Sequence, residues 1–361
     1  MEKKNNFVVF IIYGLVLVGI GVGIFFFLNS DKKEKEESNN ETNTEIKKEE
    51  ENKKEETTST DKTGKVDIIN LNSKTRPLAV AVNNTPVAVK VQEGLNKAYL
   101  VYELPTEGST SRLLALFKDE GDVTVGTIRS ARHNFADYAY ESDAVLTAYG
   151  WSHYAEDQLR KQKIINNING IISEGKMWRN NPENLASEHT AYLSTAKVRD
   201  YAKNNKKYNM ESNNTVLLKY NTGDVDLSSK SGSKNANNVT IVYGNITTKF
   251  KYDSNTKMYT RIVNDKVALD HNTKEPFVTK NVIVQKITYK KTDDNYYWDL
   301  HTVGNGDGYF ITNGKYVPIK WSKADRKAKT KFTYLDGKEI EVSDGRTYIE
   351  VQVTSRKTTI E

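Results

Sequence analysis

Three short apolar runs with charged residues at their ends characterise the stretch from 98 to 133. Tyr99 to Glu103, Ser111 to Phe117 and Val123 to Ile128 have the length and composition of buried β-strands. Buried strands usually exclude charge. Five charged side chains nevertheless lie at the ends of these runs: Glu103, Glu107, Arg112, Arg129 and Arg132. We therefore expect these side chains either to pair with one another or to face a cleft.

Phe7 to Leu28 is an uncharged apolar segment of 22 residues near the N-terminus. As a helix it would be about 33 Å long, enough to cross a hydrocarbon core of about 30 Å. It is too long for the apolar part of a cleaved signal peptide, and no small-residue cleavage site follows it. We therefore predict a single-pass membrane anchor at residues 1–28, which contacts membrane lipid through residues 7–28.

Residues 29–65 consist almost entirely of Lys, Glu, Asn, Thr and Ser. Such a composition cannot bury enough apolar surface to offset the entropy of ordering, so it predicts a disordered charged tether. More lysines follow the apolar segment than precede it, which favours a cytoplasmic location for the rest of the chain. Large domains, however, translocate largely regardless of such flanks, and a short basic N-terminus resembles an export signal. We predict that the folded part lies outside the cytoplasm.

The pattern of elements changes once after the tether. Residues 66–220 mix strand and helix patterns: a strand at 123–128, a helix at 131–141 that Ser130 would cap, and a strand at 144–149. This order predicts a βαβ unit in an α/β domain with a mixed sheet and a charged cleft. Residues 221–238 are rich in Ser, Gly and Asn and indicate a linker. Residues 239–361 contain many short strand-like runs, which predict a β-rich domain, either a sandwich or a partly open barrel. The predicted class is α+β.

Several kinds of chemistry are excluded by composition and spacing. The chain has no cysteine, so it has no disulfide, thiolate metal site or cysteine nucleophile. Its five histidines are scattered and lack the spacing of metal ligands. Neither a P-loop, a dinucleotide-binding motif nor a serine-hydrolase motif is present. We therefore expect no metal and no cofactor.

The charged cluster is the candidate ligand site. Arg129 and Arg132 flank Ser130 at the expected helix start, where backbone N–H groups and two guanidinium groups would hold a phosphate or a carboxylate. Alternatively, both arginines pair with the glutamates in a structural network that joins strand ends. The expected ligand-binding residues are Asn83, Asn84, Glu103, Glu107, Arg112, Arg129, Ser130 and Arg132.

Several segments resemble the YerB-like family of Gram-positive bacteria, a lipoprotein family of unknown function. In the first half these are RPLAVAVNN (76–84), GLNKAYLVYELPTEGSTSRLLALF (94–117), GTIRSARHNFADYA (126–139), MWRN (177–180) and EHTAYLST (188–195). In the second half the longest are VGNGDGYFITNGKYVPIKWSK (303–323) and DGKEIEVSDGRTYIEV (336–351). The resemblance implies an extracytoplasmic, membrane-tethered protein of two domains, and it implies no reaction. Relatives are anchored through a lipidated cysteine, which this chain lacks, so the apolar segment would replace it.

We therefore expect a non-enzymatic binding or assembly protein at the cell envelope, with a cell-wall polymer or another envelope protein as its partner. One alternative is a cell-wall glycan hydrolase, in which Glu103 and Glu107 would be the catalytic carboxylates. The other is a cytoplasm-facing protein whose basic second half contacts nucleic acid. Nucleic acid is the less expected partner, because a formal charge of +6 argues for solubility before it argues for a polyanion.

Overall fold

The computed structural model describes residues 66–361, so the predicted anchor (1–28) and tether (29–65) lie outside the described residues. No helix within 66–361 is long and apolar enough to cross a membrane. The described residues, 66–361, belong to one compact unit. Both hydrophobic cores of this unit are built from residues between Val66 and Ile360. A fragment that begins at Asp61 therefore contains both cores in full.

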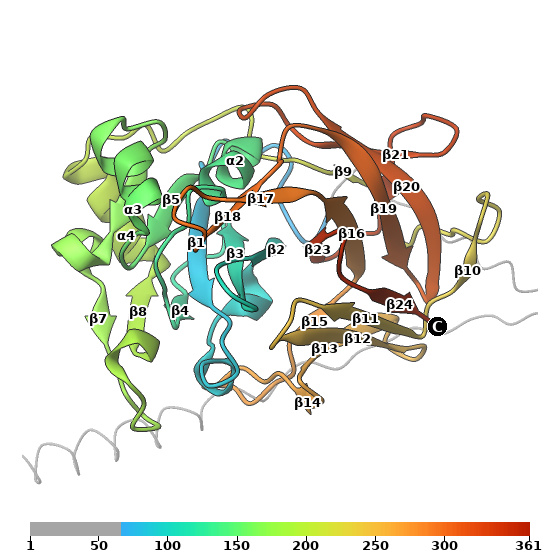
Figure 1. Ribbon diagram of the computed structural model, residues 1–361, viewed down its shortest axis with the longest axis horizontal. Helices are drawn as coiled ribbons and strands as arrows, with labels where there is room; N and C mark the ends of the chain where they lie inside the picture. Colours follow the sequence, from blue (N-terminus) through green and yellow to red (C-terminus); the bar gives the residue numbers. More distant parts are fainter. Residues whose placement is uncertain (1–65) are drawn as a thin grey trace, which may run out of the picture. The chain divides into compact units, whose positions relative to one another are not determined.

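The largest sheet has eleven strands, which come from both halves of the sequence. Their bounds are β1 Leu78–Asn83, β2 Leu100–Pro105, β3 Ser111–Phe117, β5 Val145–Ala148, β6 Asn167–Asn169, β10 Lys234–Asn235, β16 Asn281–Ile287, β19 Gly304–Thr312, β20 Lys315–Lys323, β21 Lys331–Tyr334 and β23 Thr347–Val353. The order is β10–β20–β19–β16–β23–β2–β3–β1–β5–β6, with β21 paired to β20 (Figure 1). The sheet is mixed, because β1 is antiparallel to β3 and parallel to β5.

A six-stranded antiparallel sheet packs on one face of the large sheet. Its strands are β11 Asn238–Val242, β12 Thr247–Asp253, β13 Met258–Val263, β14 Lys266–Val267, β15 Val278–Thr279 and β24 Thr358–Ile360. Ile241 and Phe250 from this sheet share a hydrophobic core with Val80 and Val284 from the large sheet. The two sheets therefore form the layers of a β-sandwich. A sandwich was one of two architectures expected for residues 239–361 alone, whereas the large sheet here also contains strands from residues 66–220.

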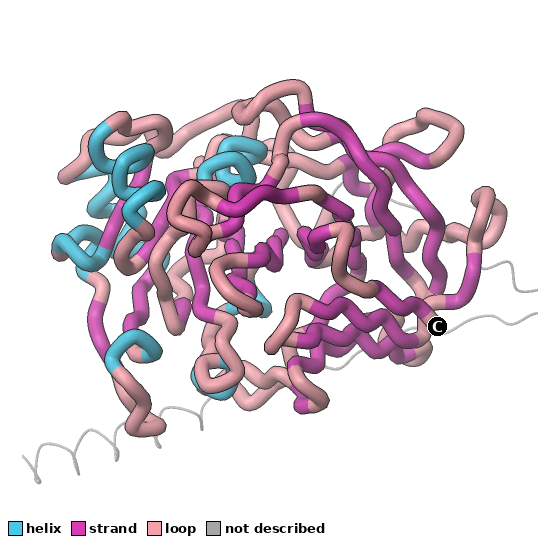
Figure 2. The backbone as a smooth tube through the Cα atoms, viewed as in Figure 1, coloured by secondary structure: helices cyan, strands magenta, loops and turns pink. Residues whose placement is uncertain are grey.

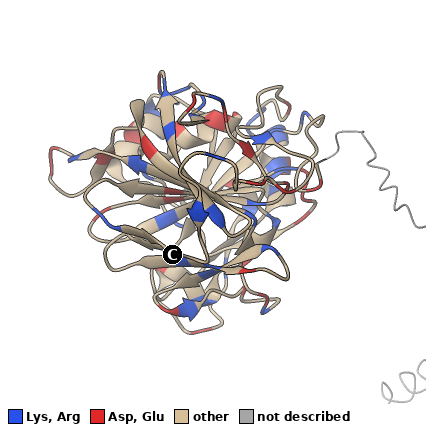
Figure 3. Cartoon of the chain, turned by 90° about the vertical axis from the view of Figure 1, so that its right-hand side faces the viewer, with Lys and Arg blue, Asp and Glu red and all other residues tan. Residues whose placement is uncertain are grey.

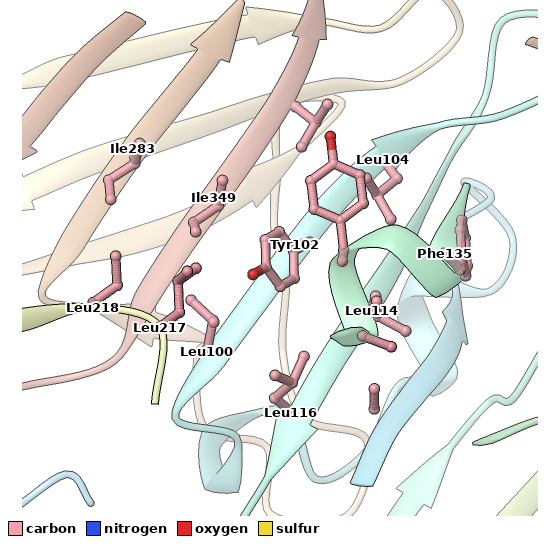
Figure 4. Packing of buried hydrophobic residues seen from close by; sticks show 14 of the residues in the cluster. Leu100, Tyr102, Leu104, Leu114, Leu116, Phe135, Leu217, Leu218, Ile283 and Ile349 are labelled. Atoms are coloured by element: carbon pink, nitrogen blue, oxygen red, sulfur yellow. The ribbon is translucent and has the colours of Figure 1, made fainter. Parts of the chain in front are cut away.

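The opposite face of the large sheet carries a second core. Leu100, Tyr102 and Leu104 of β2 point into this core, whereas Val101 points toward the six-stranded sheet. This alternation is the two-residue period of a strand that is buried on both faces. The short helix α2 (Phe135–Ala139) covers this core, to which its Phe135 contributes together with Leu114 and Leu116 of β3 (Figure 4).

Helices are few, and they gather at one end of the molecule (Figure 2). Besides α2 they are α3 (His153–Glu156) and α4 (Thr195–Asn204), with single turns of 3₁₀ or π helix elsewhere. The Ser194 hydroxyl accepts the backbone N–H of Lys197 and so caps the start of α4. Three small sheets complete the fold: β4 Thr124–Gly126 with β8 Ala191–Ser194 and β7 Trp178–Arg179, β17 Tyr289–Lys291 with β18 Trp298–Leu300, and β9 Lys219–Tyr220 with β22 Glu341–Val342.

Two local predictions were wrong. The strand at 124–126 pairs with β8 and not with β5, so the βαβ unit expected over 123–149 does not form. A parallel pair with a helix between its strands occurs one step later, where α3 lies between β5 and β6. The predicted helix begins only at Phe135, because Ala131 forms a β-bridge with Trp151. Ser130 therefore caps no helix.

Charge of both signs is distributed over the fold. In the view of Figure 3, Lys and Arg are interspersed with Asp and Glu over strands and loops.

Candidate functional site: an arginine-lined cleft

A cleft of about 350 Å³ lies where three neighbouring parallel strands end. Strands β1, β5 and β6 run in the same direction, so their carboxyl ends meet at one edge of the sheet. Ligands of open α/β sheets commonly bind outside such an edge. The lining, which we call the arginine cleft, consists of Ile128, Arg129, Ser130, Tyr149, Gly150, Trp151, Ile171, Arg179, Ser187, Glu188 and Ala191.

Arg129 reaches this cleft from a backbone that is fixed on both sides. Its N–H donates to the carbonyl of Ala81 (2.9 Å), and its carbonyl accepts the N–H of Tyr149 (3.0 Å). Its guanidinium Nε is buried without a hydrogen-bond partner, and none of the ion pairs within residues 66–361 includes Arg129. Burial lowers the pKa of Arg129, and the nearby Glu188 carboxylate opposes that change. Arginine remains charged at neutral pH even so, and Arg129 is therefore a cation in the cleft that is near Glu188 but not in direct contact with a carboxylate.

Arg179 supplies a second guanidinium group from β7. Its Nη1 donates to the Thr190 hydroxyl (3.1 Å) and to the carbonyl of Ser187. Its central carbon lies 4.7 Å from the centre of the Tyr149 ring, a cation–π distance. These contacts hold the group in one place, so little side-chain entropy remains to be lost when a ligand binds.

Glu107, Arg112 and Arg132 form an ion-pair cluster behind the cleft. Glu107 accepts Arg132 Nε at 2.6 Å and Arg112 Nη2 at 3.0 Å. Nη1 of both arginines donates to the carbonyl of Ser130, and this fixes the segment that carries Arg129. Burial alone would raise the pKa of Glu107, but the Arg132 hydrogen bond and the two positive charges lower it to about 2. Burial, reinforced by the charge of Arg132, lowers the pKa of Arg112 to about 9.

Gly150 allows the chain to pass close to Ser130. Its φ is +98°, and a Cβ there would lie 2.8 Å from the Ser130 hydroxyl oxygen. That hydroxyl donates to the carbonyl of Tyr149 (3.3 Å). A larger residue at position 150 would displace Ser130 from the wall of the cleft and strain the backbone as well.

Glu103 lies in a different environment. Its carboxylate is fully buried between the two large sheets, where it accepts Ser111 Oγ (2.7 Å), Asn84 Nδ2 (3.0 Å) and Thr248 Oγ1 (3.0 Å). Arg261 Nη2, also fully buried, is 3.1 Å away. A glycan hydrolase needs two carboxylates that face one groove. Because Glu103 is buried and Glu107 is bound by two arginines, this structure does not provide that pair.

The eight predicted ligand-binding residues therefore separate into three groups and one residue, Asn83, that lies apart from them. Arg129 and Ser130 line the cleft, and Glu107, Arg112 and Arg132 support it from behind. Asn84 and Glu103 belong to the buried cluster between the sheets, while Asn83 donates to Nδ1 of His189 (2.8 Å) beside Glu188. Sequence reasoning missed Tyr149, Trp151, Arg179 and Glu188. The Tyr-Gly-Trp run directly after a predicted strand was a usable signal for the first two residues, whereas no local pattern marks the others.

No group of three or more His, Asp or Glu side chains within residues 66–361 has an arrangement that would hold a metal ion. The groups that the arginine cleft presents are guanidinium, hydroxyl, aromatic and aliphatic, together with one carboxylate. This donor set suits an anion better than a cation.

Comparisons with known proteins place this architecture in a family. Residues 62–209 match the N-terminal domain of DUF3048, "Protein of unknown function", and residues 238–349 match its C-terminal domain. The "Putative lipoprotein YerB" of Bacillus subtilis (strain 168) is 28% identical over 281 residues, which cover 76% of this chain and 81% of the relative. The crystal structure of the YerB protein from Bacillus subtilis superposes with a TM-score of 0.68 at 25% identity, over 80% of this chain and 94% of that chain. The resemblance seen in the sequence is confirmed, and the fold is the β-rich fold of YerB, with several sheets and few helices.

Proposed function

The chain belongs to the DUF3048 family, and on that premise we propose that it is a non-enzymatic binding protein of the cell envelope. In this proposal a membrane anchor holds it outside the cytoplasm, and its arginine cleft takes the phosphate or carboxylate group of an envelope component. Cell-wall polymers carry both kinds of group.

The location is supported by two observations. The similar Bacillus subtilis protein carries the name of a lipoprotein, which is a membrane-anchored class. This chain has no cysteine to lipidate, but residues 7–28 are apolar, uncharged and long enough to span a bilayer. Protease treatment of intact cells tests the location, because an outward-facing chain is degraded without lysis. Protection until lysis would contradict it.

Arg129 carries the binding proposal. A partly buried guanidinium group without a direct carboxylate contact is unfavourable, because the charge of Glu188 at a longer distance only partly offsets its desolvation. An anion would repay it through charge-assisted hydrogen bonds, with Arg179 and Ser130 on the same wall of the cleft. The Glu107 cluster keeps this arrangement in place before any ligand arrives.

Calorimetric titration at low ionic strength tests this proposal. Glycerol phosphate and lactate, as small phosphate and carboxylate probes, are titrated into the fragment that begins at Asp61. We expect at least one of them to bind and Arg129→Gln to weaken binding about tenfold, the contribution of one charge-assisted contact. Arg356→Gln is the matched control, because Arg356 is half-buried, lies outside the cleft and forms no ion pair within residues 66–361. Binding of neither probe, or equal weakening by both variants, would refute the proposal.

A further inference from the structure

The lip of the arginine cleft is apolar and exposed, which a small soluble anion does not explain. Ile171 lines the cleft and is 52% exposed, and the next residue, Ile172, is 49% exposed. They form the only pair of consecutive large apolar side chains with such exposure in the part of the chain that the structure describes. Both lie in the 3₁₀ turn Gly170–Ile172 that follows β6. Exposed aliphatic side chains beside a polar site commonly mark a contact surface.

The cleft itself is divided between polar and apolar groups. Arg129, Arg179 and Ser130 supply guanidinium and hydroxyl groups and Glu188 supplies one carboxylate, whereas the apolar surface comes from Ile128, Trp151 and Ala191. With two guanidinium groups against one carboxylate, the charge of the cleft still favours an anion. The Trp151 side chain is half-buried. Half-buried tryptophan beside arginine and aliphatic residues is typical of a surface that meets a membrane interface.

Backbone donors at this edge are already used within the protein. Asn169 Oδ1 accepts the N–H of Gly150 (2.7 Å) and that of Ile171 (3.0 Å). The turn is thereby fixed, and a bound anion has to rely on side chains. Guanidinium groups bind phosphate oxygens well, because two N–H donors of the fork match two oxygens.

From this arrangement we infer that the arginine cleft binds the head group of a lipid phosphate, with Ile171 and Ile172 against the hydrocarbon chain. The inference rests on the proposed function and names its ligand class. A lipid phosphate combines an anion with aliphatic surface, and both parts find matching groups in the cleft and on its lip. In the anchored arrangement proposed above such lipids would be within reach, because a tether of the expected composition and of 37 residues would span roughly 35 Å.

Vesicle flotation distinguishes a lipid phosphate from a free phosphate. The fragment from Asp61 is mixed with phosphatidylcholine vesicles that contain or lack phosphatidic acid, and its affinity for glycerol phosphate, the same head group without chains, is measured in parallel. We expect binding to the phosphatidic acid vesicles to be at least about tenfold tighter than binding to glycerol phosphate, because aliphatic surface is buried only with the lipid. Pure phosphatidylcholine vesicles should not bind.

Two variants separate the two parts of the site. Ile172→Ser, which changes the lip residue that does not line the cleft, should weaken vesicle binding about threefold and leave glycerol phosphate binding unchanged. Leu335→Ser is the matched control, since Leu335 is 53% exposed and lies outside the cleft. Arg129→Gln should weaken the binding of both ligands, and Arg129→Lys, which keeps the charge but loses the fork, should have an intermediate effect.

The outcomes distinguish failure of the lipid inference from failure of the proposed function. If vesicles are bound no more tightly than glycerol phosphate, or if the isoleucine variant binds them like the wild type, the lipid inference is overturned and the anion cleft stands. If Arg129→Gln and Arg129→Lys both fold, as circular dichroism reports, and bind both ligands like the wild type, the inference and the proposed function fail together.

Discussion

At the scale of single residues, the most unusual feature is a pair of buried glutamates that share one arginine. Glu103 and Glu350 lie opposite each other on β2 and β23, and both are fully buried. Arg261 bonds directly to Glu103. Tyr243 has one hydroxyl proton but contacts two oxygens, the Glu103 carbonyl (3.2 Å) and Glu350 Oε2 (2.9 Å). Both contacts are hydrogen bonds if Glu350 is protonated and donates to Tyr243. Burial, followed by the charge of Glu103, raises the pKa of Glu350 well above its usual value, which agrees with this assignment.

The protonation of Glu350 predicts the effect of Glu350→Gln. An unfolded glutamate ionises near pH 4.3, whereas the folded one keeps its proton to a much higher pH, so wild-type stability falls as pH rises above that value. Glutamine keeps the donor toward Tyr243 and does not titrate. We expect the melting temperature of the variant, relative to wild type, to rise between about pH 5 and pH 8. Thermal unfolding across that range measures it, and a difference that does not change with pH would show that Glu350 is ionised.

The pairing of Arg261 with Glu103 predicts that removing the arginine causes a large loss of stability and that a second substitution partly restores it. Arg261→Met would leave the Glu103 carboxylate buried without its cation, which costs about 3–5 kcal/mol. Glu103→Gln in the same chain removes the uncompensated charge, so the double variant should recover a substantial part of that loss. Denaturant unfolding of the fragment from Asp61 provides both values. Additive losses in the double variant would mean that the two side chains do not interact.

At the scale of elements, the sequence predicts what is local and misses what is long-range. Strands β2, β3 and β5 are predictable from the sequence because each run is apolar, short and bounded by turn residues. The partner of β4 is not predictable in this way, because this three-residue strand pairs with β8, nearly seventy residues later in the chain. The late start of α2 follows from the bridge between Ala131 and Trp151, a contact that no local pattern encodes.

The distinction between local and long-range contacts also explains which residues of the candidate site the sequence predicts. Arg129 and Ser130 were found because charge at a strand end is conspicuous in sequence. Arg179 was missed, because its place beside Tyr149 depends on how β7 packs. Glu103 was taken as a neighbour of Glu107, yet the alternation of β2 turns its side chain toward the six-stranded sheet and Arg261.

The segment that carries Arg129 depends on Glu107, and this predicts a specific pH response. The pKa of Glu107 is lowered to about 2, so its stabilising effect is complete above the unfolded value near 4.3 and is lost as pH falls toward 2. Glu107→Gln should therefore cost about 2–3 kcal/mol at neutral pH. The variant should also lose less stability than wild type during acidification. Denaturant unfolding at neutral pH and near pH 3 gives the comparison. Parallel pH profiles for both proteins would place the stabilisation elsewhere.

At the scale of the whole molecule, one late strand joins both halves of the chain. Strand β23 is parallel to β2 on one side and to β16 on the other. The two family matches divide the chain between residues 209 and 238, but the sheet continues across that division. Pairing between strands almost 250 residues apart leaves no trace in composition or periodicity. A linker-like stretch at 221–238 therefore gives no information about whether the halves are independent in structure.

The shared sheet predicts that the two halves fold together. Residues 61–220 alone would lose β23, which exposes one edge of β2 and the apolar side chains that pack against both faces of β23. Residues 221–361 alone would lose the strands that flank β23 on the other side. We expect neither half to show a cooperative thermal transition, while the fragment from Asp61 unfolds in one transition. Calorimetry of the three proteins tests this. Two separate transitions in the long fragment, each reproduced by one half, would contradict this prediction. The hydrogen bonds between β2 and β23 would then contribute little to the stability of the fragment, and the two halves would unfold independently.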